Sequence, residues 1–420
     1  MRNMFKLALR GLLRNRRRSL VTLLAIAFGF SAITLFAGYT HNVYGGLARQ
    51  SIHGEMLGHL TLSKRGMRRE GKLDPERYML TATEVDAITK LLKDEPHVEL
   101  VAPRLAFSGL VSNGRASTIF IAESIEPAAM ERLQQNVLTE AEKKSGMFDR
   151  LKKQLDPAHP DVAELSEGLA DMLHLPVGGQ AQMLVNTLAG QANALDIGIG
   201  GTFNTGNAGS NDKFAFVSLA LARTLLDAEG RADRLTILLD DVSQTEAMRD
   251  RLQAKLRAAG FDVEIMTWQE LSDFYNQVHG MFDMIFGFIF SIVLTVVVMS
   301  VANSMGMTVI ERTREIGTLR AIGLKRSGVV RLFTTESMLL TLIGCSVGLL
   351  ISFAVRWGVN MADISYVPPN SASRVPLLVD LDAGRTLLTF VLMGVVGTVA
   401  AYLPARRAAQ KDIIDALGHV

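Results

Sequence analysis

Residues 311–323 read ERTREIGTLRAIG, a short charged stretch between two long apolar runs, Met281–Met305 and Val329–Val355. A charge at the centre of a membrane helix costs about 2.5–3.5 kcal/mol on insertion scales, so these charges belong at a water interface. If the two apolar runs cross a membrane, the charged stretch is therefore the turn at one of its surfaces.

The same stretch has the periodicity of a short amphipathic helix. Its apolar residues recur at spacings of seven and three, at Val309, Ile316, Leu319 and Ile322. Arg314 lies three positions from Glu311, and Arg312 lies three from Glu315, so each carboxylate has a candidate partner. Gly323 is placed to stop the helix. Two interpretations stay open on these grounds: a lever between two membrane helices and a cytosolic partner, and an ordinary solvated loop.

Composition excludes some classes for this 420-residue chain. Hydrophobic residues make up 48% and charged residues only 20%, which is unusual for a purely soluble protein. The net charge of +2 is too small to indicate a nucleic-acid binder. The single cysteine, Cys345, rules out an intrachain disulfide. Because it lies in an apolar run, it is predicted to be a buried structural thiol and not a nucleophile.

The N-terminal region combines basic and apolar residues. Residues 1–18 carry seven basic side chains and no acidic one, which predicts an amphipathic helix on the inner leaflet. Residues 19–40 are predicted as the first transmembrane helix, since the run Leu20–Tyr39 has the ~20 residues that a span needs. The alternative is a cleaved signal peptide, which has a shorter apolar core and a small-residue cleavage site.

Residues 41–280 are predicted to form a folded polar domain, because charges are frequent and no apolar run is long enough to span. Asn113-Gly114 between two strand-like runs indicates a hairpin. The β, α, β order from Arg234 to Thr267 indicates an α+β unit. Strands are expected at Leu60–Leu62, Val98–Val101, Leu105–Val111, Ser117–Ala122, Ala181–Val185, Phe214–Ser218, Leu235–Leu239 and Val263–Met266, and helices at Ala128–Leu155, Asp161–Leu173, Leu219–Ala228 and Gln244–Ala259.

Motifs for catalysis or metal binding are absent from the sequence. Residues 198–201 read GIGG within the glycine-rich segment Gly178–Gly209, but no Lys-Ser or Lys-Thr follows. The phosphate-loop pattern is therefore missing, and turns with a flexible hairpin are predicted instead. The eight histidines show neither HExxH nor paired ligand spacing, and no GxSxG is present. The sequence predicts a chain that is not an enzyme and has no metal site.

Three further transmembrane helices are predicted at residues 281–305, 329–355 and 386–403. Pro404 is expected to stop the last of them. Gly344 and Gly348 form a GxxxG pattern, which permits close contact between membrane helices.

Basic residues give the predicted orientation. They are concentrated in residues 1–18, in the coupling segment 306–328 and in the tail 404–420. The loop 356–385 contains only Arg374 between its bordering arginines. The positive-inside rule then places both termini and the coupling segment in the cytoplasm, and residues 41–280 outside.

The string VIERTREIGTLRAIGLKRSGVVRLFTTESMLL, residues 309–340, resembles the coupling segment of FtsX-like, MacB-type ABC transporter permeases. That family includes lipoprotein-releasing permeases and macrolide exporters. The tail AYLPARRAAQKDIIDAL, from Ala401, resembles the family's ending, and Ala8–Gly29 resembles its opening. The positions that match in the coupling segment are Glu311, Arg312, Arg314, Glu315, Ile316, Gly317, Arg320, Ala321, Gly323 and Glu336.

The resemblance implies an α-helical integral membrane protein of the bacterial inner membrane. It implies four transmembrane helices with a large α+β periplasmic domain inserted between helices 1 and 2, the type VII ABC fold. The resemblance assigns ATPase coupling to the nine matching positions between Glu311 and Gly323. Gly344 and Gly348 are predicted as packing positions from their GxxxG pattern. The resemblance also implies a separate cytoplasmic ABC ATPase that binds ATP and Mg, and a second permease copy or a related permease.

In that family, motion of the ATPases passes through the helices to the external domain, which is called mechanotransmission. The implied cargo is a lipoprotein or a lipid-like molecule, handled next to membrane lipids, with a periplasmic protein as a further partner. The alternative function is a scaffold of the FtsX type, which controls periplasmic cell-wall hydrolases and transports nothing.

Overall fold

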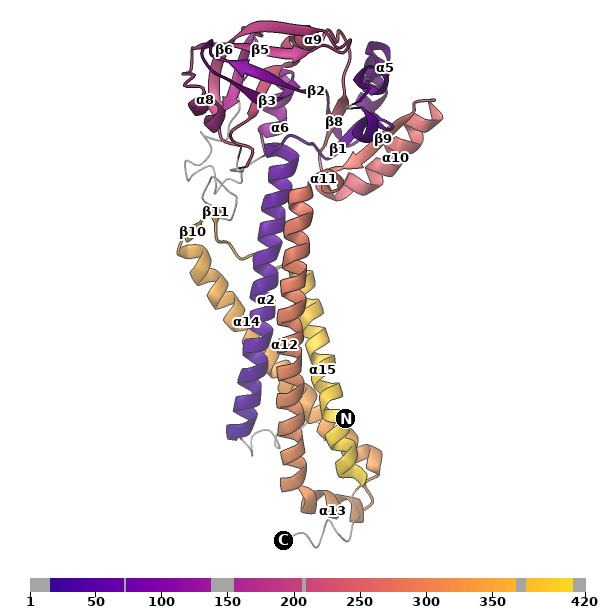
Figure 1. Cartoon of the computed structure of the whole chain (residues 1–420). Coiled ribbons are helices and arrows are strands. Elements are labelled where there is room, and N and C mark those ends of the chain that lie inside the picture. The colour runs from indigo at the N-terminus through magenta and orange to yellow at the C-terminus, as the bar shows by residue number, and fades with distance from the viewer. Residues whose placement is uncertain (1–15, 72, 137–154, 206–208, 368–374, 411–420) are drawn as a thin grey trace. The chain divides into compact units, whose positions relative to one another are not determined.

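The computed structural model in Figure 1 describes residues 16–71, 73–136, 155–205, 209–367 and 375–410. The chain divides into two compact units. The helical unit comprises Met1–Tyr44, Val278–Ser365 and Pro376–Val420, and the sheet unit comprises Gly45–Gln277 and Tyr366–Val375. Most of the helix predicted over residues 1–18, and the tail beyond Gln410, lie outside the described residues.

The described strands of the sheet unit form one sheet in the order β3-β7-β4-β6-β5-β2-β8-β1-β9. Because β3 also pairs with β2, six of these strands close into a ring, β2-β3-β7-β4-β6-β5. The remaining three continue from β2 as an open extension. The strands are β1 (Leu60–Lys64), β2 (Val98–Ser112), β3 (Ser117–Ile125), β4 (Val162–Ser166), β5 (Gln180–Asn186), β6 (Ala192–Phe203), β7 (Phe214–Ser218), β8 (Arg234–Leu239) and β9 (Val263–Thr267).

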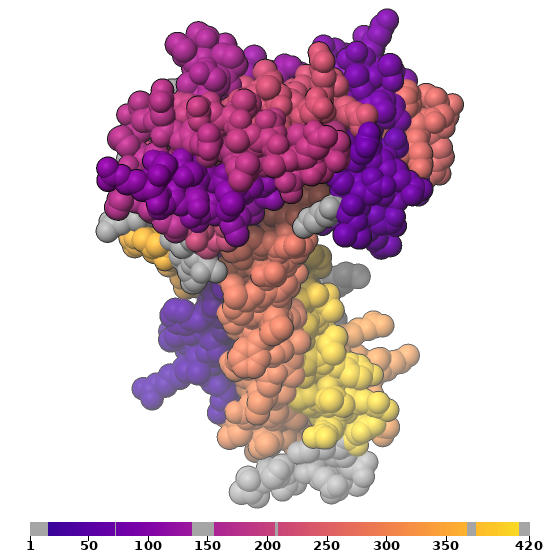
Figure 2. All heavy atoms as spheres, turned by 45° about the horizontal axis from the view of Figure 1, so that its top comes forward, coloured from indigo at the N-terminus to yellow at the C-terminus, as the bar shows by residue number. Residues whose placement is uncertain are grey.

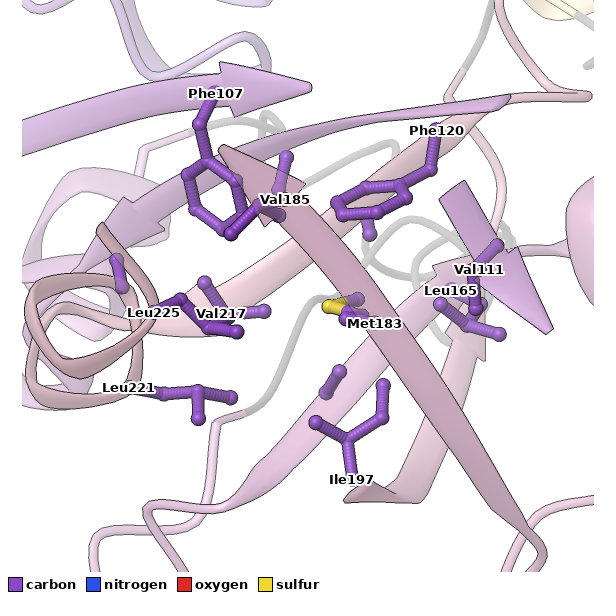
Figure 3. Packing of buried hydrophobic residues seen from close by; sticks show 14 of the residues in the cluster. Phe107, Val111, Phe120, Leu165, Met183, Val185, Ile197, Val217, Leu221 and Leu225 are labelled. Carbon is purple, nitrogen blue, oxygen red and sulfur yellow. The ribbon is translucent and has the colours of Figure 1, made fainter. Parts of the chain in front are cut away.

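The long strand β2 belongs to both parts of this sheet. Its first half, Val98–Arg104, pairs with β8, and its second half, Leu105–Ser112, pairs with β3. The inward side chains of the ring form one apolar core, in which Phe107, Phe120 and Met183 lie together (Figure 3). A second core lies under the extension, where α5 and α10 cover its strands. Successive side chains of a strand point to opposite faces of the sheet, so burial alternates along strands such as β5 and one face supplies the core.

Short helices complete the sheet unit, and local capping explains where several begin. Thr81 and Glu84 form a reciprocal capping box at α5, and the Ser218 hydroxyl accepts a hydrogen bond from the Leu221 N–H at α9. These helices are α3 (Met67–Glu70), α4 (Pro75–Tyr78), α5 (Ala82–Lys93), α6 (Pro127–Gln134), α8 (Glu167–Met172), α9 (Leu219–Leu226), η2 (Val242–Gln244), α10 (Thr245–Ala258) and α11 (Trp268–Leu271).

Several sequence predictions for this unit are confirmed. The Asn113-Gly114 hairpin connects β2 to β3, with Gly114 at φ +83° and the Asn113 side chain accepting hydrogen bonds from the Arg115 and Ala116 N–H groups. The β, α, β unit at the end of the domain is β8, α10 and β9, with β1 inserted between the two strands in the sheet.

Two predictions are wrong. Residues Asp161–Leu173 are not one helix, because Val162–Ser166 forms β4, which pairs with β6 and β7 before α8 begins. The glycines of residues 198–201 lie inside strand β6 and not in a turn. A side chain at Gly200 would overlap Val162 of β4, so glycine permits the close approach of the two strands. Of the helix predicted over Ala128–Leu155, only the start is confirmed, as α6 (Pro127–Gln134), and residues 137–154 lie outside the described residues.

Among the described residues, four helices are long and apolar enough to cross a membrane. The first is α2 (Arg16–Arg49) with the π-helical turn η1 (Gln50–Gly54), and the others are α12 (Asp273–Glu311), α14 (Arg326–Met361) and α15 (Ala383–Gln410). The helical unit also contains the short helix α13 (Thr313–Ala321). The short strands β10 (Ser365–Tyr366) and β11 (Val375–Pro376) lie between α14 and α15 in the sequence.

The fourth long helix corrects one prediction, because α15 continues past Pro404 to Gln410. Proline removes one hydrogen bond and its ring crowds the carbonyl four residues earlier, but a helix can continue past it when its last turns are packed. Ala405, Ala408 and Ala409 are all buried in the core of the helical unit, and this packing supports the last turns.

Candidate coupling site

The break between α12 and α13 sets the geometry of the candidate site. α12 ends at Glu311, Arg312 has a non-helical backbone, and α13 begins at Thr313. The Thr313 hydroxyl donates to the Val309 carbonyl at 2.9 Å and is buried, which holds the start of α13 against α12. Gly323, at φ +105°, follows the end of α13, as the sequence predicts for a glycine in the left-handed region.

Arg312 joins this break to the next long helix. Its Nε donates to Glu315 at 2.9 Å, and its Nη1 donates to Glu336 of α14 at 3.0 Å. The guanidinium also lies over the Phe333 ring, 5.6 Å from its centroid. The side chain of Glu336 is only 2% exposed, and that of Arg312 is 15% exposed. Removing one partner of a buried ion pair typically costs about 3–5 kcal/mol, because the other charge is left buried without a partner. Arg312 thus links Glu315 of α13 to Glu336 of α14.

A second ion pair lies at the end of α12. Arg18 of α2 contacts Glu311 at 3.0 Å, with both side chains about one third exposed. The sequence paired Glu311 with Arg314 instead, and that prediction is wrong, whereas the pair between Arg312 and Glu315 is confirmed. The charges around the break therefore connect α13 to α14, and α12 to α2.

The other predicted coupling residues divide between two faces of α13. Ile316 and Gly317 are buried against the helical core. Arg314 and Ala321 are exposed, and Gly323 is exposed beyond the end of the helix. The predicted apolar face is only partly correct, because Leu319 and Ile322 are exposed to solvent, Ile322 by 80%. Arg320 lies at the edge between these faces and is half-buried.

Glycines bring α2 and α14 close together away from the break. A Cβ atom on Gly348 would lie 2.5 Å from the Ala27 carbonyl oxygen, and one on Gly344 would lie 2.8 Å from Ile26 Cγ2. Ser352 donates to Ser31 at 3.1 Å in the same interface. The predicted packing glycines thus lie between these two helices, where only a hydrogen atom fits.

Sequence reasoning missed the partners that organise the site. Glu336 is one of the matching positions, but nothing local predicts its contact with Arg312, which is 24 positions away. Arg18 is one basic residue among seven in its region, so no signal there singles it out. Within the described residues, no group of three or more His, Cys, Asp or Glu side chains is arranged to hold a metal ion.

Two family models match the chain. The MacB-like periplasmic core domain matches residues 19–255, and the FtsX-like permease C-terminal domain matches residues 287–413. The solved periplasmic region of MacB from Actinobacillus actinomycetemcomitans is similar to half of the chain, at 15% identity and a TM-score of 0.33, over 89% of that structure.

Three curated relatives are similar over shorter segments. The pyoverdine export ATP-binding/permease protein PvdT of Pseudomonas entomophila is 32% identical over 42% of this chain and 25% of the relative. The ABC transporter permease YtrF of Bacillus subtilis is 32% identical over 31% of each chain. The macrolide export ATP-binding/permease protein MacB of Bordetella avium is 35% identical over 30% of this chain and 17% of the relative. The chain thus spans less than a third of the length of each.

Proposed function

This chain belongs to the FtsX/MacB-type family of ABC transporter permeases, and we propose that it transmits the work of ATP hydrolysis in the cytosol to the sheet unit outside. The observation that supports this proposal is Arg312, which joins the short helix α13 to the long helix α14. A force on α13 is passed to α14 through a buried contact and not through a flexible loop.

The proposed membrane placement follows from the four apolar helices and from the basic residues. The four helices cross the bacterial inner membrane, with α13 on the cytoplasmic side, where the basic residues gather. The main part of the sheet unit, Gly45–Gln277, is then the periplasmic domain. The chain passes between the two units within α2, within α12 and at the short strands β10 and β11.

The exposed face of α13 is the proposed docking site for a separate ABC ATPase, which would bind ATP and Mg. Leu319 and Ile322 expose large apolar side chains there, and the Arg314 side chain is exposed in the first turn of the same helix. Apolar anchors beside an arginine are typical of the centre of a protein interface. A second copy of this permease, or a related one, completes the transporter, since an ABC ATPase works as a pair. The cargo we propose is a lipoprotein or a lipid-like molecule.

Three single substitutions in the complex with the ATPase test this proposal. Arg312→Gln should leave ATPase co-purification unchanged, because its side chain faces α14, but should lower ATP-dependent cargo transfer at least tenfold. Ile322→Asp should reduce co-purification itself, because it places a charge in the apolar docking face. Arg326→Gln, at the exposed start of α14, is the matched control and should change neither measurement.

Unchanged cargo transfer in Arg312→Gln would contradict the coupling role. A distinct result would favour the scaffold function: capture of a cell-wall hydrolase by the sheet unit, together with no change in lipids or lipoproteins when the chain is depleted. Accessibility of residues 41–280 to protease only from the cytosolic side would overturn the membrane placement.

A further inference from the structure

A long groove lies between α12 and α15 in the helical unit, with a volume of about 970 Å³. Figures 1 and 2 both show the two helices side by side, α12 in orange and α15 in yellow. The walls are almost entirely aliphatic: α12 contributes Leu294, Val298 and Ile310, and α15 contributes Val395, Val399 and Leu403. The groove is open along its side, so it is accessible to whatever surrounds the helices.

One end of this groove is cationic. Arg407 of α15 belongs to its lining, and its side chain is exposed. In the part of the chain that the structure describes, no carboxylate forms an ion pair with Arg407. Asn303 of α12 adds a polar amide to the wall. A ligand that matches the groove therefore has long apolar tails and an anionic group at one end.

The length of the groove matches one leaflet of a bilayer. The residues of α12 that line it run from Leu294 to Ile310, about 24 Å at 1.5 Å per residue. Half of the hydrocarbon core is about 15 Å thick, and the headgroup region adds roughly 6 Å. In the proposed orientation, Arg407 lies at the cytoplasmic end, where a phosphate of the inner leaflet would be. A guanidinium binds phosphate through two parallel hydrogen bonds, and its positive charge favours a headgroup of net negative charge over a zwitterionic one.

We propose that this groove binds an anionic phospholipid of the inner leaflet, with acyl chains along the aliphatic walls and the phosphate at Arg407. The inference rests on the membrane placement proposed above. Val309, three residues before Arg312, also lines the groove, so the bound lipid packs next to the start of the coupling site. The lipid then acts as a wedge that sets the separation of α12 and α15 at their cytoplasmic ends.

A fluorescence measurement on the full chain tests the site directly. Val399→Trp places a reporter on the wall, where the native side chain is 64% exposed. The protein is reconstituted in vesicles of phosphatidylcholine and phosphatidylglycerol, with brominated acyl chains on one lipid at a time, and the signal of the chain without the reporter is subtracted. Brominated phosphatidylglycerol should quench the reporter's fluorescence about fivefold more effectively per mole than brominated phosphatidylcholine. This is the preference expected from one arginine near the membrane surface. Arg407→Gln should abolish this preference, and Arg406→Gln, an exposed neighbour outside the groove, should keep it.

Equal quenching by the two lipids would overturn the proposal, because it would mean only nonselective contact with the bilayer. Absence of quenching would also overturn it, since a second copy of the chain would then cover the groove. Both leaflets of the vesicle have the same composition, and no ATPase is present. The result is therefore independent of orientation and of coupling, and Arg312→Gln should leave it unchanged.

Discussion

Buried polar side chains have different partners in the two units. In the sheet unit they bond the backbone of distant elements: Arg104 Nη1 donates to the Met56 carbonyl at 2.6 Å, and His53 Nδ1 donates to the Leu133 carbonyl at 2.8 Å. In the helical unit several buried hydroxyls bond the carbonyl four residues earlier in their own helix, as Thr308 does with Ser304. The buried polar groups of the sheet unit therefore tie distant elements together. In the helical unit a few polar pairs, such as Arg312 with Glu336 and Ser352 with Ser31, join separate helices.

Contacts between the long helices depend mainly on shape. Gly348 fits against the backbone at Ala27, and Gly29 fits against Val293 of α12. An unpaired buried backbone group costs roughly 1–3 kcal/mol, so a movement that breaks such bonds is opposed strongly. Sliding one packed helix along another breaks few of them. This difference favours the proposed transmission of motion through the helical unit over motion within the sheet unit.

The largest predicted effect breaks the polar network of the sheet unit. Arg104 is fully buried and bonds Met56, Ser124 and Glu123, and the ion pair of Glu123 with Arg234 lies in the same cluster. Arg104→Met keeps a similar volume but leaves two carbonyls and one carboxylate without this donor. We expect the free energy of unfolding of the sheet unit to fall by about 3–5 kcal/mol. This free energy is measured by denaturant titration of the full chain. The fluorescence of buried Trp268 reports unfolding, in a Trp357→Phe background that removes the other tryptophan.

The matched control is an exposed arginine in the same unit. Arg65 pairs with Asp262 at 2.8 Å, but both side chains are more than half exposed. Arg65→Met should therefore cost only about 0–1 kcal/mol. Equal losses in the two variants would mean that burial of the network contributes nothing to its strength, and the contrast between the units would fail.

The next effect concerns pH and the same unit. Burial lowers the pKa of His59 to about 4, while its Nδ1 accepts a hydrogen bond from the Leu239 N–H at 3.0 Å. Unfolded histidine titrates near 6.5, so between pH 6.5 and pH 4 the unfolded chain takes up a proton that the folded chain does not. The contribution of His59 to the free energy of unfolding is therefore full above pH 6.5. It decreases as the pH falls toward 4, by up to about 3 kcal/mol.

His59→Asn retains an acceptor for Leu239 and removes the titration. The variant should lose less stability than the native chain between pH 7.5 and pH 4.5, as measured by denaturant titration at each pH. His53, Asp240 and Asp241 face His59 and are present in both proteins, so the comparison isolates the change made at His59. Parallel pH profiles would show that His59 does not carry the dependence.

The sequence predicted those strands whose local pattern is unambiguous, but not the closed ring. Val162–Ser166 has the composition of a helix, and it becomes a strand only because β6 and β7 present their edges to it. No local pattern records that pairing. The glycines of β6 read as turn residues for the same reason, since their role depends on β4, which lies more than thirty positions earlier.

At the candidate site the limits of prediction are the same. The pair between Arg312 and Glu315 follows from helical spacing, because both partners belong to one turn. The contacts of Arg312 with Glu336, and of Arg18 with Glu311, join separate helices and cannot be read from spacing. Ile322 was placed on an apolar face that should be buried, but of that face only Val309 and Ile316 belong to the core, and Leu319 and Ile322 are exposed.

The smallest effect tests whether shape holds the long helices together. A Cβ on Gly348 would meet the α2 backbone, so Gly348→Ala should destabilise the helical unit by about 1–3 kcal/mol. Gly358 lies in the same helix with no heavy atom near its Cβ position, and Gly358→Ala is the control, expected to cost nothing.

Cys345 is the single cysteine of the chain and is buried. Its reaction with a maleimide dye on heating therefore reports when these helices separate. If the two alanine variants react at the same temperature as the native chain, close approach is not what binds α2 to α14. The hydrogen bond between Ser352 and Ser31 in the same interface would then carry more of the contact, and the two helices would be less free to shift than their packing indicates.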